Sequence, residues 1–280
     1  MKTIFAAMGL SVALSTAAWA TTVEEKTAMN GEAQVGYSVR GSGPLVVMIA
    51  STGRSSGELG PLADRLAERG FKVALPEPRG IGQSTGKLTD VSFHDFGDDF
   101  AAVIQQEGGE AIVAGHAYGQ WIAKTIAADH PEMVQGVALI AGGAKTWPKE
   151  LSDAITMIND PASTDEQKMS GLMLAFFTDE EAAKPWLEGW HQDVTESQRA
   201  ARKVTERDSY WNAGTAPILD LQAGNDPFRP ESSREEVREE LGAERVTVAV
   251  IDGASHALPA SHPVETADAL ADWAETILKK

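Results

Sequence analysis

Short apolar runs alternate with segments of helical period along most of this chain. The run from Pro44 to Ser51 ends in turn residues, as a buried strand does. Between Leu59 and Ala67 the apolar residues recur at spacings of three and four up to Gly70, which is typical of a helix packed on one face. Because strands that alternate with helices pair in parallel, the pattern predicts an α/β fold with a mostly parallel sheet covered by helices on both faces.

The same rule predicts further elements and one interruption. Apolar runs predict strands at 71–75, 111–114, 134–140, 216–223 and 246–251, and helical spacing predicts helices near 96–104, 120–130 and 264–278. No strand pattern occurs from 145 to 213, where helical segments carry four tryptophans. We therefore expect a helical cap over 145–213 inserted into a core formed by 21–144 and 214–280. The tryptophans either pack the cap onto the core or line a substrate pocket.

The first twenty residues have the pattern of an export signal. Lys2 gives a short positive start, Ile4 to Leu14 is apolar, and Ala18-Trp19-Ala20 has the small residues of a cleavage site. The apolar run is too short to span the roughly 30 Å of a bilayer. The sequence thus predicts a signal peptide over 1–20 that is cleaved near Ala20. The mature protein would then be periplasmic or secreted and have no membrane span.

Charge and cysteine content restrict the possible partners. With 24 Lys and Arg against 41 Asp and Glu, the net charge is −17, and there is no basic run for nucleic acid or anionic membranes. We therefore expect a small neutral or apolar substrate. The absence of cysteine excludes disulfides, thiolate metal sites and a cysteine nucleophile. None of the six histidines has H-x-x-x-H spacing, so we expect neither a metal nor a cofactor.

A glycine-bounded pentapeptide is the strongest motif. Gly115-His116-Ala117-Tyr118-Gly119 lies between a predicted buried strand and a predicted helix, which is the context of a nucleophile elbow. Asp226 follows the strand at 216–223, and His256 follows the strand at 246–251. Elbow, acid and histidine therefore occur in the chain order that this kind of triad uses.

With these residues, the sequence resembles the α/β-hydrolase superfamily from about residue 36 to 278. The stretch 79–84 (RGIGQS) is similar to a loop of that family, 129–131 (DHP) is similar to the end of the helix behind the elbow, and the cap falls where the family inserts its lids, between strands six and seven. The resemblance implies that Ala117 stands at the nucleophile position, with Asp226 and His256 as its triad partners. It also implies an oxyanion hole formed by backbone amides of Tyr118 and of Ser51 or Thr52.

Alanine at position 117 decides the chemistry, because a methyl group cannot attack a carbonyl carbon. Losing a serine nucleophile costs on the order of 10⁶ in kcat, so ordinary acyl-enzyme turnover is not expected. The alanine is either an introduced knock-out or a native residue. The ancestral activity implied by the resemblance is hydrolysis of a small ester, lactone or related carbonyl substrate.

Three functions remain open for a native alanine. Asp226–His256 activates water or a substrate proton directly, a neighbouring hydroxyl replaces the missing nucleophile, or the protein is a non-catalytic pseudo-hydrolase that binds a small ligand. The candidate hydroxyls are those of Ser51, Thr52, Ser55, Ser56 and Tyr118. His116 is expected to pack beneath the elbow, and Glu77 is expected to be a structural partner of Arg79.

Overall fold

The computed structural model describes residues 22–279, so the predicted signal peptide and its cleavage site near Ala20 lie outside the described residues. The described chain folds around one eight-stranded sheet of order β1-β2-β4-β3-β5-β6-β7-β8. The strands are β1 (Glu24–Asn30), β2 (Ala33–Gly41), β3 (Leu45–Ile49), β4 (Lys72–Pro76), β5 (Ala111–His116), β6 (Val134–Ile140), β7 (Ile218–Ala223) and β8 (Val246–Ile251). No helix of the described part combines the length and apolar character needed to cross a bilayer.

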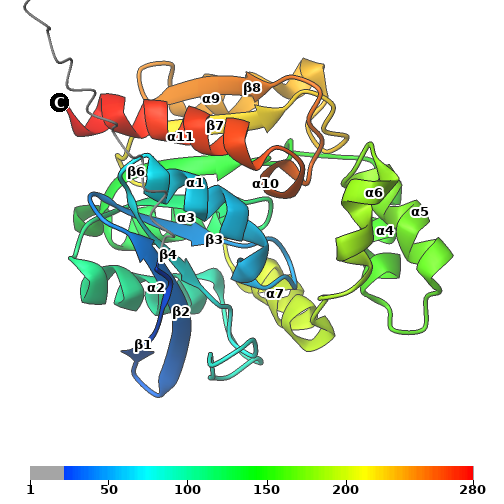
Figure 1. The fold of residues 1–280 in the computed structure, drawn as a ribbon, viewed down its shortest axis with the longest axis horizontal. Helices are drawn as coiled ribbons and strands as arrows, with labels where there is room; N and C mark the ends of the chain where they lie inside the picture. Colours follow the sequence, from blue (N-terminus) through cyan, green and yellow to red (C-terminus); the bar gives the residue numbers. More distant parts are fainter. Residues whose placement is uncertain (1–21, 280) are drawn as a thin grey trace, which may run out of the picture.

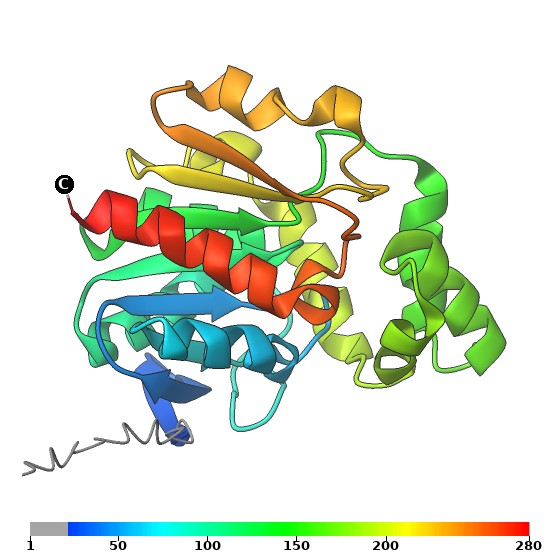
Figure 2. The same ribbon diagram turned by 45° about the horizontal axis from the view of Figure 1, so that its top comes forward.

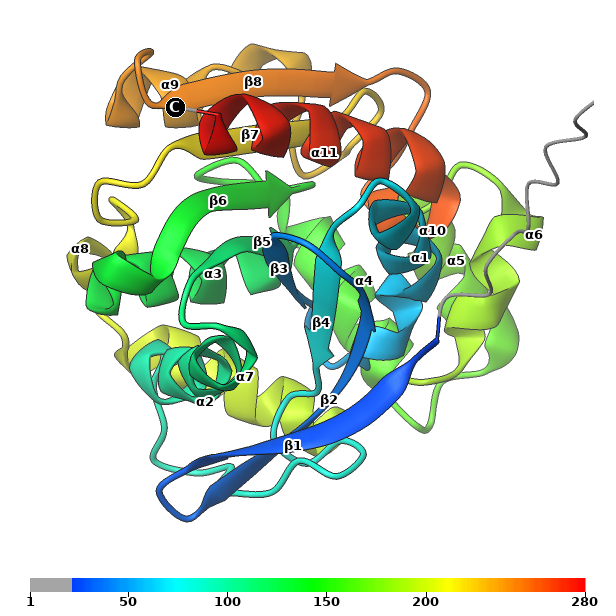
Figure 3. The same cartoon turned by 60° about the vertical axis from the view of Figure 1, so that its left-hand side comes forward.

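Strands β3 to β8 are parallel to one another. The second strand, β2, is antiparallel to both of its neighbours, β1 and β4. Every residue of β3, β5 and β7 is buried, which explains why β3 and most of β5 appear in the sequence as continuous apolar runs. In β7 the apolar residues are interrupted by the buried polar side chains of Asp220 and Gln222. The β1–β2 hairpin at one edge of the sheet was not predicted (Figure 3). In β1 only Ala28 is buried, so this edge strand has no apolar run.

Helices cover both faces of the sheet, as predicted (Figure 1). On one face, α1 (Gly60–Glu68) and α11 (Pro263–Leu278) pack through residues such as Leu66 and Leu270. On the other face, α2 (Phe93–Glu107) and α3 (Gly119–Asp129) pack through residues such as Ile104. The shorter helices α9 (Glu236–Leu241) and α10 (Leu258–Ser261) complete the core. The predicted α/β-hydrolase fold class is therefore confirmed.

A helical segment occupies the connection between β6 and β7, where the insertion was expected. It contains α4 (Lys149–Asn159), α5 (Asp165–Ala175), α6 (Glu180–Ala183), α7 (Gln192–Val204) and α8 (Arg207–Tyr210). Most of it lies beyond one end of the sheet (Figure 2). A separate apolar cluster joins Phe176 and Trp186 of this segment to Phe228 and Ala257 of the core. The segment is thus packed onto the core by its own side chains, and the site lies where the two meet.

Candidate active site

The pentapeptide at 115–119 forms a tight strand-to-helix turn between β5 and α3. Ala117 has a φ of 48°, in the left-handed region that alanine seldom adopts, and its N–H donates to the Ile140 carbonyl at 2.9 Å. A Cβ on Gly115 would lie 2.1 Å from the Gly119 oxygen, and a Cβ on Gly119 would lie 2.5 Å from the Ile49 oxygen. Both flanking positions must therefore be glycine, and the turn has the geometry of a nucleophile elbow.

Asp226 and His256 meet in the loops that follow β7 and β8. Nδ1 of His256 donates to Oδ2 of Asp226 at 2.8 Å, and both side chains are buried. The other carboxylate oxygen of Asp226 accepts from the Phe228 N–H at 2.8 Å. The Phe228 ring lies 4.3 Å from the imidazole, centroid to centroid, and fixes its plane. Because Nδ1 carries the proton shared with the carboxylate, Nε2 of the neutral imidazole is a proton acceptor.

His116 packs beneath the elbow, as expected, and it also hydrogen-bonds to the backbone of His256. It is fully buried, and its Nε2 donates to the His256 carbonyl oxygen at 2.9 Å. Its Nδ1 lies 3.6 Å from Oε1 of Glu58, whose other oxygen accepts from Arg54 at 2.8 Å. His116 therefore positions the backbone of His256 and does not reach the cavity.

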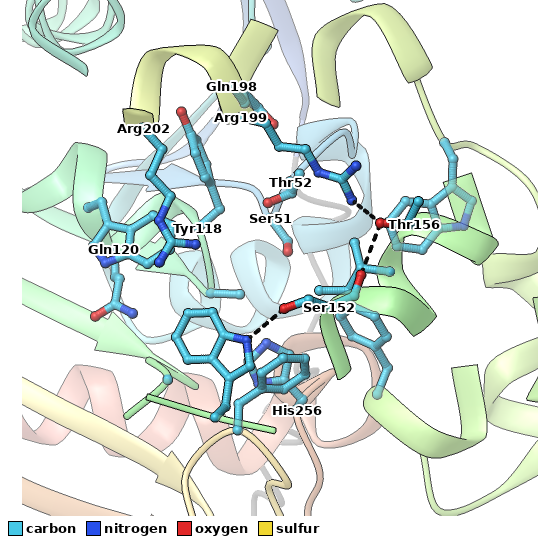
Figure 4. A pocket seen from close by; sticks show the side chains of 18 of the residues that line it. Ser51, Thr52, Tyr118, Gln120, Ser152, Thr156, Gln198, Arg199, Arg202 and His256 are labelled. Atoms are coloured by element: carbon cyan, nitrogen blue, oxygen red, sulfur yellow. Dashed lines mark hydrogen bonds between the residues drawn. The ribbon is translucent and has the colours of Figure 1, made fainter. Parts of the chain in front are cut away.

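Ala117 and His256 line one cavity of about 500 Å³ between core and cap (Figure 4). Its wall is aromatic where Trp147 and Trp190 of the cap and Trp121 of α3 contribute. Two of the four tryptophans in 145–213 thus line this cavity, in agreement with one of the two interpretations. Trp186 instead packs between the cap and the core, outside the cavity lining. Within residues 22–279, no three His, Cys, Asp or Glu side chains are grouped so as to hold a metal ion.

The residues expected to form the oxyanion hole lie beside Ala117. Ser51 and Thr52 line the same cavity as Tyr118, and their side chains point toward its centre (Figure 4). Among the described residues, the N–H groups of Ser51, Thr52 and Tyr118 have no hydrogen-bond acceptor. These three N–H groups are thus unengaged within the described chain, as the predicted oxyanion hole requires.

The cap holds the loop that supplies these donors. The N–H of Gly53 donates to Oε1 of Gln198 at 2.8 Å, and its carbonyl accepts from the N–H of His191 at 2.9 Å. Both partners belong to α7 or to the residue before it. The position of Ser51 and Thr52 is thus coupled directly to the position of the cap.

The structure separates the five hydroxyls that were candidates to replace the nucleophile. Ser55 donates to the Glu77 carboxylate at 2.6 Å, and Ser56 donates to the Leu75 carbonyl at 3.2 Å, so both are engaged behind the loop. The Tyr118 hydroxyl is buried without a partner, and burial raises its pKa well above its ordinary value. Of these five candidates, Ser51 and Thr52 line the cavity with hydroxyls that no other group of the described chain engages.

The expectation for Glu77 was wrong. Arg79 pairs instead with Asp99 of α2, through Nε at 2.5 Å and a second N–H at 2.9 Å. Glu77 accepts from the Ser55 hydroxyl and from the Ser56 N–H. The reason is that Asp99 projects from a neighbouring helix and satisfies the Nε–Nη2 edge of the guanidinium, while Nη1 donates to the Lys87 carbonyl at 3.2 Å. Glu77 is left to brace the loop after β3.

The sequence did not predict the arginines in and beside the cavity, of which Arg199 and Arg202 line it and Arg54 lies next to it. Arg54 lies in the loop after β3 with its guanidinium 4.5 Å from the Trp186 ring and 4.7 Å from the Trp190 ring. Arg202 of α7 lines the cavity 4.3 Å from the Trp121 ring. For Arg202, the spacing of Arg199, Arg202 and Lys203 on one helical face was a signal that could have been used.

Comparisons with known proteins bear on the family and the fold of this chain. The family described as "Serine aminopeptidase, S33" matches residues 43–172. The 2-(acetamidomethylene)succinate hydrolase of Mesorhizobium japonicum is 34% identical over 102 residues, which are 36% of this chain and 36% of that protein. The (E)-2-((N-methylformamido)methylene)succinate hydrolase of Acinetobacter baylyi is 24% identical over 86% of this chain and 94% of its own length.

A solved structure extends the likeness over the whole fold. The crystal structure of an E-2-(acetamidomethylene)succinate hydrolase superposes with a TM-score of 0.73 at 19% identity, covering 91% of this chain and all of that one. The stronger sequence match spans only about a third of the Mesorhizobium protein, so the activity of that protein is not carried over with it. Strand order, elbow and structural likeness together show that this chain has the α/β-hydrolase fold, and the family match over residues 43–172 supports its place in that superfamily.

Proposed function

We propose that this chain hydrolyses a small ester, lactone or related carbonyl substrate, with the Asp226–His256 dyad activating a water molecule in place of a serine. One observation carries the proposal: a buried imidazole, oriented by a carboxylate at 2.8 Å, lines the same cavity as the methyl group of Ala117. A protein that only binds a ligand gains nothing from holding an imidazole in this way, because the pair costs desolvation free energy.

The reaction follows from the positions of these groups. Replacing serine by alanine removes one oxygen atom, and a water molecule bound beside the Ala117 methyl supplies that atom again. Nε2 of His256 takes a proton from this water as its oxygen attacks the carbonyl carbon, and Asp226 stabilises the imidazolium. The N–H groups of Tyr118 and of Ser51 or Thr52 bind the developing oxyanion. The intermediate then collapses, and the leaving group departs with the proton from His256.

The comparisons support hydrolysis as the reaction class. The relatives reported above are named as hydrolases of small succinate derivatives that carry an amide-type nitrogen. Their names support a small polar carbonyl compound as substrate here, and the cavity of about 500 Å³ is large enough to hold one.

A panel of short p-nitrophenyl esters, simple lactones and N-acyl enamines tests the proposal on the purified mature chain. We expect slow turnover of at least one class, without a burst and without a covalent adduct by mass spectrometry. His256→Ala should lower that rate by about 10² or more. His262→Ala is the matched control, because His262 bonds to Ser261 and does not line the cavity, and it should leave the rate unchanged. A rate indifferent to His256→Ala would refute the dyad mechanism.

The alternative function is a non-catalytic small-ligand binder, and the alanine at 117 is the observation that favours it. Under this alternative, no substrate of the panel is turned over, and ligands bind with the same affinity before and after His256→Ala. The two functions therefore predict different results for His256→Ala: a loss of turnover for the hydrolase, and unchanged ligand affinity for the binder.

We also propose that the protein is exported and acts in the periplasm or outside the cell. Support comes from the sequence of residues 1–20, with its apolar run and small residues at the cleavage site. Cell fractionation with intact-mass analysis tests this: an exported chain lacks the first twenty residues, whereas a full-length chain in the cytoplasmic fraction would contradict it.

A further inference from the structure

One wall of the cavity is cationic although the whole chain carries a charge of −17. Arg199, Arg202 and Lys203 all line the cavity from α7. The lining contains no aspartate or glutamate among the described residues. The arginines lie at the α7 side of the cavity, across from His256 (Figure 4). Local charge at the site is therefore opposite in sign to the charge of the protein.

The guanidinium of Arg202 forms no ion pair with a carboxylate of the described residues. Several other arginines of the described part pair with acids, as Arg79 does with Asp99 and Arg229 does with Asp220. For Arg202, no ion pair or hydrogen bond to the described residues is formed. Arg202 is an exposed residue, yet desolvation of its guanidinium against the cavity wall lowers its pKa, since no acid lies close enough to offset that desolvation.

The aromatic wall holds Arg202 in a way that leaves its donors available. Its guanidinium lies 4.3 Å from the Trp121 ring and 5.2 Å from the Trp147 ring. Stacking on an indole uses the flat face of a guanidinium, whereas its N–H groups point outward in the plane. A preformed edge of N–H donors matches the two oxygens of a carboxylate.

Arg199 strengthens this end of the cavity. It donates to the Thr156 hydroxyl of α4 at 3.1 Å, which fixes its position, and it has no acidic partner in the described part of the chain. Lys203 adds a third cation one helical turn away. Arg202 and Lys203 are exposed and Arg199 is half-buried, so solvent screens part of their mutual repulsion, and an anion bound among them relieves the rest.

We propose that the cavity binds an organic carboxylate, with Arg202 as its principal contact and Arg199 and Lys203 close to it. The reacting carbonyl of the same molecule then lies toward Ala117 and His256. This inference deepens the proposed function, on which the assignment of the carboxylate as a substrate rests. It differs from the neutral ligand expected from net charge, because binding depends on the charges that line the cavity.

Equilibrium binding tests the inference without any turnover. The probes are 4-phenylbutyrate and its neutral analogue 4-phenylbutanamide, whose ring suits the tryptophan wall, each titrated calorimetrically into the mature chain at pH 7.5. We expect the carboxylate to bind about tenfold more tightly or better than the amide. Arg202→Gln should remove that preference and leave the amide affinity within about twofold, whereas Arg202→Lys should retain part of it.

Arg238→Gln is the matched control, because Arg238 pairs with Glu235 outside the cavity lining and its loss should leave both affinities unchanged. Arg202→Met keeps the apolar stem against the indoles and should behave as Arg202→Gln does, with near-UV circular dichroism confirming the fold. His256→Ala should still bind the carboxylate, so a failure of hydrolysis and a failure of carboxylate binding are separate results. Equal affinities for acid and amide, absence of carboxylate binding, or a preference that survives Arg202→Gln would overturn the proposal.

Discussion

The two halves of the site differ in what they have kept. The half at β7 and β8 holds a complete acid–histidine pair, buried and joined at 2.8 Å. The half at β5 holds an elbow with its strained φ of 48° and its two glycines, yet the side chain at its tip is a methyl group. The elbow thus has the geometry of a nucleophile site without the nucleophile.

This difference shows which parts of such a site the fold requires. The elbow backbone is fixed by packing, because Gly115 and Gly119 touch neighbouring backbone and the Ala117 N–H is bonded to β6. A hydroxyl at 117 would point into the cavity, so its absence leaves no buried group unpaired. The dyad is different, because removing either partner leaves a buried polar group without its hydrogen bond. Chemistry at the elbow is therefore easier to lose than chemistry at the dyad.

The largest effect should come from restoring the missing oxygen. Ala117→Ser places a hydroxyl beside the existing imidazole and free backbone donors, so we expect esterase activity on short p-nitrophenyl esters to rise by about 10³ or more. Burst kinetics and an acyl-enzyme mass should accompany the gain. If the Ala117→Ser chain folds but is as inactive as its parent, the elbow does not present residue 117 to His256 in a geometry that allows catalysis.

The acid of the dyad should be essential in that restored enzyme. Asp226→Asn in the Ala117→Ser background should lower kcat by about 10⁴, because the amide favours the wrong tautomer of His256. Comparing Asp226→Asn in the parent and in the Ala117→Ser chain, by initial rates, shows whether water and serine depend on the same pair. Asp252→Asn, on an exposed turn outside the cavity lining, serves as the control. If Asp226→Asn lowers the rate only in the Ala117→Ser chain, the activity of the parent does not depend on the Asp226–His256 pair.

The scaffold of the elbow should respond through stability. In Gly115→Ala the new Cβ meets a backbone oxygen at 2.1 Å, so we expect the free energy of unfolding to fall by about 3 kcal/mol. Gly57→Ala, whose Cβ would meet only a side-chain oxygen at 3.4 Å, should change it by less than about 0.5 kcal/mol. Urea unfolding gives both values. Equal stability for the two variants would show that the elbow is not fixed by packing.

A buried lysine behind the elbow makes stability depend on pH. Lys124 of α3 is fully buried without a hydrogen-bond partner, and burial lowers its pKa to about 7. Between pH 7 and the unfolded-state value near 10.5, the unfolded chain binds the extra proton, so stability should rise with pH by at most about 1.4 kcal/mol per unit. Lys124→Met should remove that slope in urea melts at successive pH values. An unchanged slope would assign it to other groups.

The sequence was sufficient for some of these features and insufficient for others. Strands such as β5 were predictable because a strand buried on both faces is apolar throughout, whereas β1 was missed because it buries little. The positions of Ala117, Asp226 and His256 were predictable from turns after apolar strands. The role of Arg202 was not, because its charge acquires meaning only where the cap brings it against Trp121, far away in the sequence.

The smallest effect should come from relaxing the elbow itself. A non-glycine residue in the left-handed region costs about 1–2 kcal/mol, and glycine regains this at an entropic cost of about 0.5–1 kcal/mol. Ala117→Gly should therefore raise the free energy of unfolding by roughly 0.5–1 kcal/mol in urea melts. Ala114→Gly, in the regular part of β5, should lower it by about as much. If Ala117→Gly destabilises the chain as Ala114→Gly does, the methyl group at 117 contributes packing that outweighs the backbone strain. If Ala117→Gly stabilises the chain, the backbone strain at 117 is not offset by packing.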